Sequence, residues 1–207
     1  MTETSIYGKF TESLLELKKS LELKIISWNE EAVREGKHKY FEHLTSRLKT
    51  EASMREKLKR RGLTETTENA LYQMKDAIGL RIVTRFVDDI YRVKEKLAAL
   101  PGVAIEEEKD YIQNVKPSGY RSLHLILRCE TETADLYGRI PGVFFAEVQI
   151  RTIAMDSWAS LEHEMHYKRE GENHGLIAAE LKRCADDLAS CDLSMQTIRN
   201  LIRKEEV

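Results

Sequence analysis

The segment from Lys109 to His124 combines a defined turn with side chains that could hold a nucleotide. Pro117 fixes its own φ angle and Gly119 can adopt a positive φ, so the Lys-Pro-Ser-Gly segment predicts a shaped loop between two strands. The turn is surrounded by an aromatic ring, three cations, a hydroxyl group and an imidazole, which belong to Tyr120, Lys109, Lys116, Arg121, Ser122 and His124. An aromatic ring can stack on a purine base while cations hold phosphate oxygens. Taken alone, the pattern fits a solvated hairpin loop about equally well.

An apolar strand expected over residues 79–86 carries charged groups. Asp76 stands at its start. Because side chains alternate along a strand, Arg81, Val83 and Arg85 share one face. A structural ion pair would explain one of these guanidinium groups, but two on one strand favour a nearby anion or base.

A second strand, expected over residues 143–151, has one apolar face and one polar face. Its polar face presents Glu147, Gln149 and Arg151. An edge strand with a solvated face would show the same alternation. Three residue types with functional chemistry in a row on one face favour a binding surface instead.

The stretch from residue 47 to residue 61 is basic. A strand expected over residues 41–49 places Arg47 and Lys49 on one face, and residues 50–61 predict a helix. Seven basic residues oppose two acidic ones in this stretch. Judged on residue types alone, such a charge run is usually a solvated face.

Length and composition set broad limits. A chain of 207 residues can form one domain with a full core. Its net charge of −2 gives no basic footprint, so an anion site has to be built locally. We expect no membrane span or signal peptide, because no apolar run approaches about 18 residues and the first positions are charged. The three cysteines lack metal-ligand spacing, and a reducing cytoplasm fits them best.

Helical periodicity dominates both ends of the chain. Near the N-terminus, apolar residues recur every three or four positions at Phe10, Leu14, Leu17, Leu21, Ile25 and Trp28. Further helices are expected over residues 87–100 and 153–169; the spacing of His163 and His166 in the latter does not match the zinc-binding His-Glu-x-x-His pattern. A last helix carries a heptad seam of Ile177, Leu181, Cys184, Leu188, Cys191, Met195, Ile198 and Ile202. This seam predicts packing onto the N-terminal helix or onto another subunit. The fold class is α+β, a mixed sheet flanked by helices.

An ordered set of motifs links these features. The set comprises Ser46-Arg47-Leu48-Lys49, Lys75-Asp76-Ala77-Ile78-Gly79-Leu80-Arg81-Ile82, Gly119-Tyr120-Arg121-Ser122-Leu123-His124, Glu147-Val148-Gln149-Ile150-Arg151-Thr152, Trp158-Ala159-Ser160-Leu161-Glu162-His163 and Tyr167-Lys168. In this order, over residues 46–168, it resembles the synthetase domain of the RelA/SpoT family. The short chain is similar to the single-domain members of that family, the small alarmone synthetases.

The resemblance implies a fold and a reaction. The fold is a nucleotidyltransferase-like mixed sheet in a single synthetase domain over residues 1–207. It divides into an N-terminal helix (1–40), a catalytic core (41–170) and a C-terminal helix (176–205). The reaction is that of a GTP diphosphokinase, which transfers pyrophosphate from ATP to the 3′-hydroxyl of GDP or GTP and yields AMP with ppGpp or pppGpp.

The same resemblance implies roles for individual residues. Asp76 and Glu147 would hold Mg²⁺, and Glu147 would also orient or deprotonate the ribose hydroxyl. ATP would be bound by Arg47, Lys49, Lys57 and Arg81. GDP or GTP would be bound by Lys116, Tyr120, Ser122, His124 and Gln149. Glu162 and His163 would support the polar face of the sheet, with Tyr167 and Lys168 near phosphate.

Further expectations concern activity and partners. None of the six histidines is followed by Asp, which is the metal motif of the family's hydrolase, so we expect synthesis without hydrolysis. The mixed charges of Glu106 to Asp110 leave the acceptor preference open. The resemblance implies a homotetramer in the cytoplasm and admits RNA binding as a side activity. Two rival functions are a catalytically silent sensor of guanine nucleotides or RNA, and a transferase that attaches nucleotides to RNA or protein.

Overall fold

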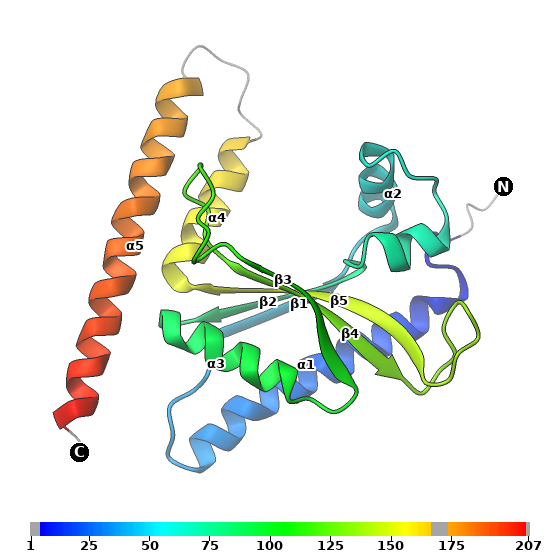
Figure 1. Cartoon of the computed structure of the whole chain (residues 1–207), viewed down its shortest axis with the longest axis horizontal. Coiled ribbons are helices and arrows are strands. Elements are labelled where there is room, and N and C mark those ends of the chain that lie inside the picture. Colours follow the sequence, from blue (N-terminus) through cyan, green and yellow to red (C-terminus); the bar gives the residue numbers. More distant parts are fainter. Residues whose placement is uncertain (1–4, 167–173, 206–207) are drawn as a thin grey trace.

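A single five-stranded sheet forms the centre of the protein, with strand order β1-β2-β5-β4-β3 (Figure 1). The computed structural model describes residues 5–166 and 174–205. The strands are β1 (His43–Leu48), β2 (Ile78–Thr84), β3 (Val103–Asp110), β4 (Leu123–Thr131) and β5 (Gly142–Thr152). The pair β2 and β5 is parallel, and the other neighbouring pairs are antiparallel. The sheet is therefore mixed, as the sequence predicts.

Helices surround this sheet. In chain order they are η1 (Gly8–Phe10), α1 (Thr11–Arg34), α2 (Glu51–Arg60), the short π-helix η2 (Asn69–Gln73), α3 (Val87–Ala98), α4 (Ile153–His166) and α5 (His174–Glu205). Thr50 caps α2 by accepting a hydrogen bond from the Ser53 backbone N–H. Among the described residues, no helix is both long and apolar enough to cross a membrane. The sequence analysis did not predict η2.

The two faces of the sheet have different environments. Helices α1 and α3 lie on one side of the sheet, whereas α2 and α4 rise on the other side (Figure 1). On the α1 side, Leu123, Leu125 and Leu127 are fully buried and join one core with the apolar stripe of α1. The apolar stripe predicted near the N-terminus is confirmed. The opposite face, between α2 and α4, carries the polar residues.

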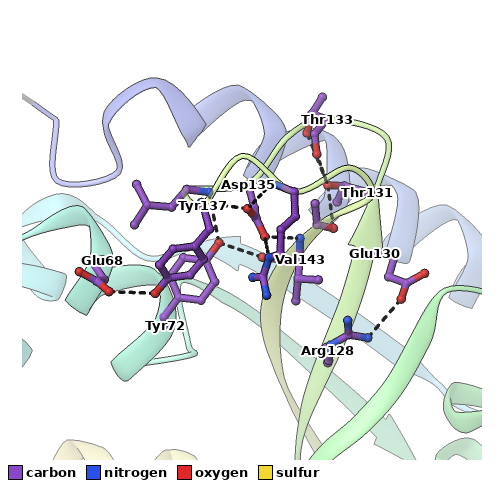
Figure 2. Close-up of polar contacts among 12 residues, drawn as sticks. Glu68, Tyr72, Arg128, Glu130, Thr131, Thr133, Asp135, Tyr137 and Val143 are labelled. Atoms are coloured by element: carbon purple, nitrogen blue, oxygen red, sulfur yellow. Dashed lines mark hydrogen bonds and ion pairs between the residues drawn. The ribbon is translucent and has the colours of Figure 1, made fainter.

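The β4–β5 connection is an ordered hairpin. The carboxylate of Asp135 is buried at its centre and accepts hydrogen bonds from the backbone N–H groups of Tyr137, Arg139 and Val143 (Figure 2). The Arg139 guanidinium donates to the same carboxylate at 2.6 Å. Tyr72 lies across the base of the hairpin and donates to the Val143 carbonyl. These donors offset the cost of burying the Asp135 carboxylate, so its burial has a structural role in the hairpin.

Helix α5 packs differently from the heptad prediction. Its buried residues are Ala185, Ala189, Asp192 and Arg199. Half of the predicted seam is exposed, namely Ile177, Cys191, Ile198 and Ile202. Among the described residues, the helix packs chiefly on α4 and α3 rather than on α1. The buried stripe is displaced from the seam because small residues allow close approach and two polar anchors fix the helix: Asp192 to Thr152 at 2.7 Å, and Arg199 to Asp89 at 2.8 Å.

Candidate active site

A polar cleft of about 220 Å³ lies on the open face of the sheet. The strand register builds it, since Gly79 of β2 stands between Arg47 of β1 and Glu147 of β5. The next row aligns Thr45, Arg81 and Gln149 in the same way. Because β5 is central, between β2 and β4, the edge-strand alternative is wrong. Gly79 has no side chain and forms the floor below the Arg47 side chain, whose Cγ lies 3.9 Å from the position that a Cβ would take.

Two lysines converge on Asp76 beside this cleft. Lys49 at the end of β1 and Lys57 on α2 both donate to Asp76 Oδ2, the latter at 2.5 Å. The Asp76 side chain is buried, and its second oxygen, Oδ1, has no hydrogen-bond partner. Burial lowers the pKa of Lys49, against the opposing effect of the Asp76 carboxylate. These lysines are thus not part of a solvated face, in contrast to the exposed Lys59, Arg60 and Arg61.

The loop is solvated over residues 113–118 but packed at its Gly119–Tyr120 end. The Tyr120 ring centroid lies 5.9 Å from that of Tyr111, 5.8 Å from His124 and 6.3 Å from Trp158. The Lys116 ammonium sits 4.9 Å from the Tyr120 ring centroid. Strand β4 begins at Leu123, because Tyr120 still belongs to the turn and its carbonyl accepts from the Lys116 N–H.

Gly119 fixes this loop against α5. Its φ angle is +92°, which residues with a side chain rarely adopt. A Cβ at this position would also lie 2.5 Å from the Ala185 Cβ. The residue therefore has to be glycine for two independent reasons, and the loop rests directly on the C-terminal helix.

A buried arginine connects the residues expected to bind the guanine nucleotide. Arg151 of β5 is 5% exposed and donates from Nη2 to the Tyr120 hydroxyl at 2.7 Å and to Gln149 Oε1 at 2.9 Å. Its Nε donates to Ser122 Oγ at 3.3 Å. Ser122 is fully buried, so its hydroxyl holds Arg151 instead of lining the open face. Its expected direct contact with nucleotide does not fit this placement.

His124 lies between the loop and Glu147. Its Nε2 is 2.7 Å from the Tyr120 hydroxyl, and its Nδ1 is 3.7 Å from Glu147 Oε1. Burial, together with the cations Arg151, Lys116 and Lys109, lowers the pKa of His124 to about 3. The imidazole is therefore neutral near pH 7. Glu147 itself is half-buried and accepts from Gln149 Nε2 through Oε2 at 3.3 Å.

The arginines of β2 have partners within the fold. Arg81 contacts Asp156 at 3.4 Å while its side chain remains 43% exposed over the cleft. Arg85 lies beyond the strand and pairs with Glu42 at 2.6 Å. The interpretation that Arg81 and Arg85 jointly face an anion is therefore wrong for Arg85. The Glu42 carboxylate, which lies just before β1, explains the position of Arg85.

The expected residues thus form two groups on one face. The first group is the expected ATP side: Arg47 and Arg81 line the cleft, and Lys49 and Lys57 are held together on Asp76. The second group gathers around Arg151 and consists of Lys116, Tyr120, Ser122, His124 and Gln149, of which Gln149 also lines the cleft. Glu147 lies between the groups. Glu162 and His163 belong to α4, and Tyr167 and Lys168 lie outside the described residues. Arg151 was expected on the polar face of β5 as part of a binding surface, without an individual role. Asp156, which pairs with Arg151 at 3.2 Å, was not expected at the site.

The donor set can be tested for a magnesium site. Among residues 5–166 and 174–205, no three histidine, cysteine or acidic side chains converge on one point. Mg²⁺ needs few protein ligands, because one or two carboxylates, substrate phosphates and water complete its shell. The unpartnered Oδ1 of Asp76 is the type of oxygen that such an ion takes. The residues therefore fit a magnesium ion held jointly with a nucleotide.

An open sheet face with two carboxylates among lysines and arginines has the groups that enzymes of phosphoryl transfer use, namely cations for phosphate oxygens and carboxylates for a metal ion. Comparisons with known proteins identify the family. A family model described as the region found in RelA / SpoT proteins matches residues 46–172. The GTP pyrophosphokinase YwaC of Bacillus subtilis (strain 168) is 41% identical over 162 residues, which cover 78% of this chain and 75% of that protein.

Solved structures agree in fold. A GTP pyrophosphokinase family protein from Streptococcus pneumoniae superposes with a TM-score of 0.82 at 32% identity, covering 95% of this chain and 94% of that one. The small alarmone synthetase 1 of Bacillus subtilis, bound to its product pppGpp, superposes with a TM-score of 0.79 at 33% identity, covering 91% and 94%. The family match spans more than half of the chain. The chain belongs to the RelA/SpoT family.

Proposed function

We propose that this chain is a (p)ppGpp synthetase that transfers the β,γ-pyrophosphoryl group of ATP to the 3′-hydroxyl of GDP or GTP. The observation that carries the proposal is the single open face on which Asp76, Glu147 and the expected ATP-binding cations lie together. The 3′ oxygen attacks the β-phosphorus of ATP. The bond from that phosphorus to the oxygen bridging the α-phosphate breaks, and AMP leaves with the electron pair.

The side chains divide the work of this reaction. Lys49, Lys57 and the two arginines of the cleft neutralise the oxygens of the triphosphate, because catalysis of phosphoryl transfer is chiefly positioning and charge stabilisation. Glu147 orients the 3′-hydroxyl and accepts its proton. Asp76 and Glu147 are the residues that would hold Mg²⁺, which supplies further neutralisation of phosphate charge when bound.

One assay separates this proposal from its rivals. The protein is incubated with γ-labelled ATP, GDP and Mg²⁺, and the products are separated by thin-layer chromatography. Label in a guanosine product supports the proposed reaction. Label in free pyrophosphate indicates attachment of a nucleotide to another acceptor, and the absence of turnover indicates a sensor of nucleotide or RNA. We further propose a cytoplasmic location and synthesis without hydrolysis.

Tyr120→Ala should raise the apparent KM for GDP by about five- to a hundred-fold and change the KM for ATP little. Stacking of a base on an aromatic ring is worth roughly 1–3 kcal/mol, which corresponds to about that range of affinity. Steady-state kinetics with each nucleotide varied in turn measure both constants. Equal effects on the two substrates would show that Tyr120 only maintains the fold.

We also propose that α5 forms the contact between subunits of a homotetramer. Apolar side chains on its outer surface are exposed: Leu193 by 66%, Ile198 by 56%, Leu201 by 57% and Ile202 by 52%. A second copy of the chain would bury them, and such burial is favourable. We propose RNA binding only as a side activity. Its support is the family resemblance, not a basic surface.

The double variant Leu193→Glu/Leu201→Glu should reduce the assembly to dimers or monomers, because charges would enter the interface. The melting temperature of the subunit fold should change little, since both side chains are exposed. Light scattering and thermal melting test the two statements. Leu188→Glu is the matched control, because Leu188 packs inward against the Trp158 cluster and its replacement should lower the melting temperature. An unchanged assembly of the double variant would contradict the proposed interface.

A further inference from the structure

Arg151 is the most connected charged side chain at the site, yet it does not lie in the cleft. It is buried, with four hydrogen-bond acceptors around its guanidinium group. These are Ser122 Oγ at 3.3 Å, Asp156 Oδ1 at 3.2 Å, Tyr120 Oη at 2.7 Å and Gln149 Oε1 at 2.9 Å. A guanidinium group only donates hydrogen bonds. It therefore imposes an orientation on each neighbour that can either donate or accept.

The first consequence concerns His124. The Tyr120 hydroxyl accepts from Arg151, which leaves its single hydrogen to point toward His124 Nε2 at 2.7 Å. If Nε2 were protonated as well, the tyrosine hydrogen would have no partner in this half-buried pocket. Nε2 is therefore the acceptor, and the proton of the neutral imidazole resides on Nδ1. That nitrogen faces Glu147 Oε1 at 3.7 Å, a separation that can shorten to a hydrogen bond when substrates bind.

The second consequence concerns Gln149. Its amide oxygen accepts from Arg151, so its amide nitrogen has to point the other way. That nitrogen donates to Glu147 Oε2 at 3.3 Å. Two chains of polar groups thus start at one guanidinium group. The Gln149 chain ends in a hydrogen bond to Glu147 Oε2, and the Tyr120–His124 chain ends 3.7 Å from Glu147 Oε1.

We propose that Arg151 is a positioning residue that orients Glu147 through Tyr120–His124 on one oxygen and through Gln149 on the other. The inference rests on the proposed function, in which Glu147 handles the acceptor hydroxyl. Lysine cannot replace arginine in this role, because one ammonium group cannot reach acceptors in several directions within a plane. Arg151 itself need not touch either nucleotide.

The tautomer of His124 is measurable without any nucleotide, and this separates the inference from the proposed activity. Long-range ¹H–¹⁵N correlation spectra distinguish protonated from unprotonated imidazole nitrogens, and a His124→Asn variant assigns the signals among the six histidines. We expect the Nδ1–H form in the unaltered protein. Arg151→Lys and Tyr120→Phe should each give a mixture of the two forms. A predominant Nε2–H form in the unaltered protein, or an unchanged Nδ1–H form in Tyr120→Phe, would overturn the inference.

Kinetics supply the second test. Arg151→Lys should lower kcat by about 10- to 100-fold, the range expected when a catalytic group is misplaced by a fraction of an ångström to an ångström, with little change in either KM. Tyr120→Phe keeps the ring and one of the two chains, so its kcat should fall less and its KM for GDP should stay near that of the unaltered protein. If Arg151→Lys raises the KM for GDP and leaves kcat unchanged, Arg151 binds nucleotide and the inference is wrong.

Arg199→Gln is the matched control for removing a buried arginine. Arg199 is 8% exposed and pairs with Asp89 at 2.8 Å, among residues that do not line the cleft. Its replacement should lower the melting temperature without shifting the His124 tautomer. A loss of the Nδ1–H form in this variant equal to that in Arg151→Lys would show a general effect of destabilisation and would refute the specific role.

Discussion

Glu147→Gln should lose turnover by about 10²-fold or more while it still binds both nucleotides, because a positioned general base commonly contributes at least that factor. Glutamine keeps the size of the side chain but cannot accept a proton and has lost the negative charge. The Gln149 amide, which now donates to this carboxylate, would face a neutral group. Single-turnover measurements and equilibrium binding of each nucleotide separate the chemical step from affinity.

A suitable control for this variant is Glu42→Gln. The Glu42 side chain is 23% exposed, close to the 27% of Glu147, and pairs with Arg85 beyond the end of β2. Removal of this charge should leave kcat within about two-fold of the unaltered protein, because surface ion pairs contribute little. If Glu147→Gln retained activity within a few-fold, another group would have to activate the acceptor hydroxyl.

Asp76→Asn should lower kcat by about 10²-fold or more. Its affinity for ATP should stay the same or increase. The carboxylate now occupies both lysines, since Lys49 and Lys57 donate to the same oxygen. Without it, the ammonium groups are free to bind phosphate, but the oxygen ligand proposed for Mg²⁺ is lost. Removal of one preorganised electrostatic group typically costs about 10² to 10³ in kcat. Calorimetric titration with a non-hydrolysable ATP analogue and turnover at increasing Mg²⁺ measure the two effects.

Destabilisation has to be separated from this loss of chemistry. Asp89→Asn removes another buried aspartate, which pairs with Arg199 and Arg92. This control should lower the melting temperature and keep turnover, because Asp89 pairs with arginines of α3 and α5 and not with Lys49 or Lys57. Weaker ATP binding by Asp76→Asn, together with full turnover at high Mg²⁺, would mean that Asp76 serves the fold alone.

Much of the fold follows from periodicity. Helix α1 and strands β4 and β5 each have one apolar face. Because burial of apolar surface is favourable, the sequence pattern determines which face of each element is buried. Sheet order is different, because no local pattern states that β5 lies between β2 and β4. The seam of α5 shows a second limit: a regular apolar spacing does not reveal that Asp192 and Arg199 supply the polar anchors.

In the candidate site, too, some residues can be predicted from local sequence patterns and others only from tertiary contacts. Asp76 and Glu147 can be recognised in the sequence, because one is a carboxylate at the start of an apolar strand and the other lies on the polar face of a strand. Arg151 shares the face of Glu147 and is visible in the alternation, but its role depends on contacts with Tyr120 and Ser122 from a distant loop. Asp156 gives no signal at all, since an acidic residue in the first turn of a helix already has a local reason.

The contact of Gly119 with Ala185 bears on how modular this enzyme is. The family model matches residues 46–172, but the loop that contains Gly119 packs against a helix beyond that limit. A chimera that joined residues 46–172 to the C-terminal helix of a relative would inherit the carboxylates and the cations. It would inherit the shape of the loop only if the new helix carried alanine or glycine where it meets Gly119. The residues proposed for catalysis and the shape of this loop therefore depend on different parts of the chain.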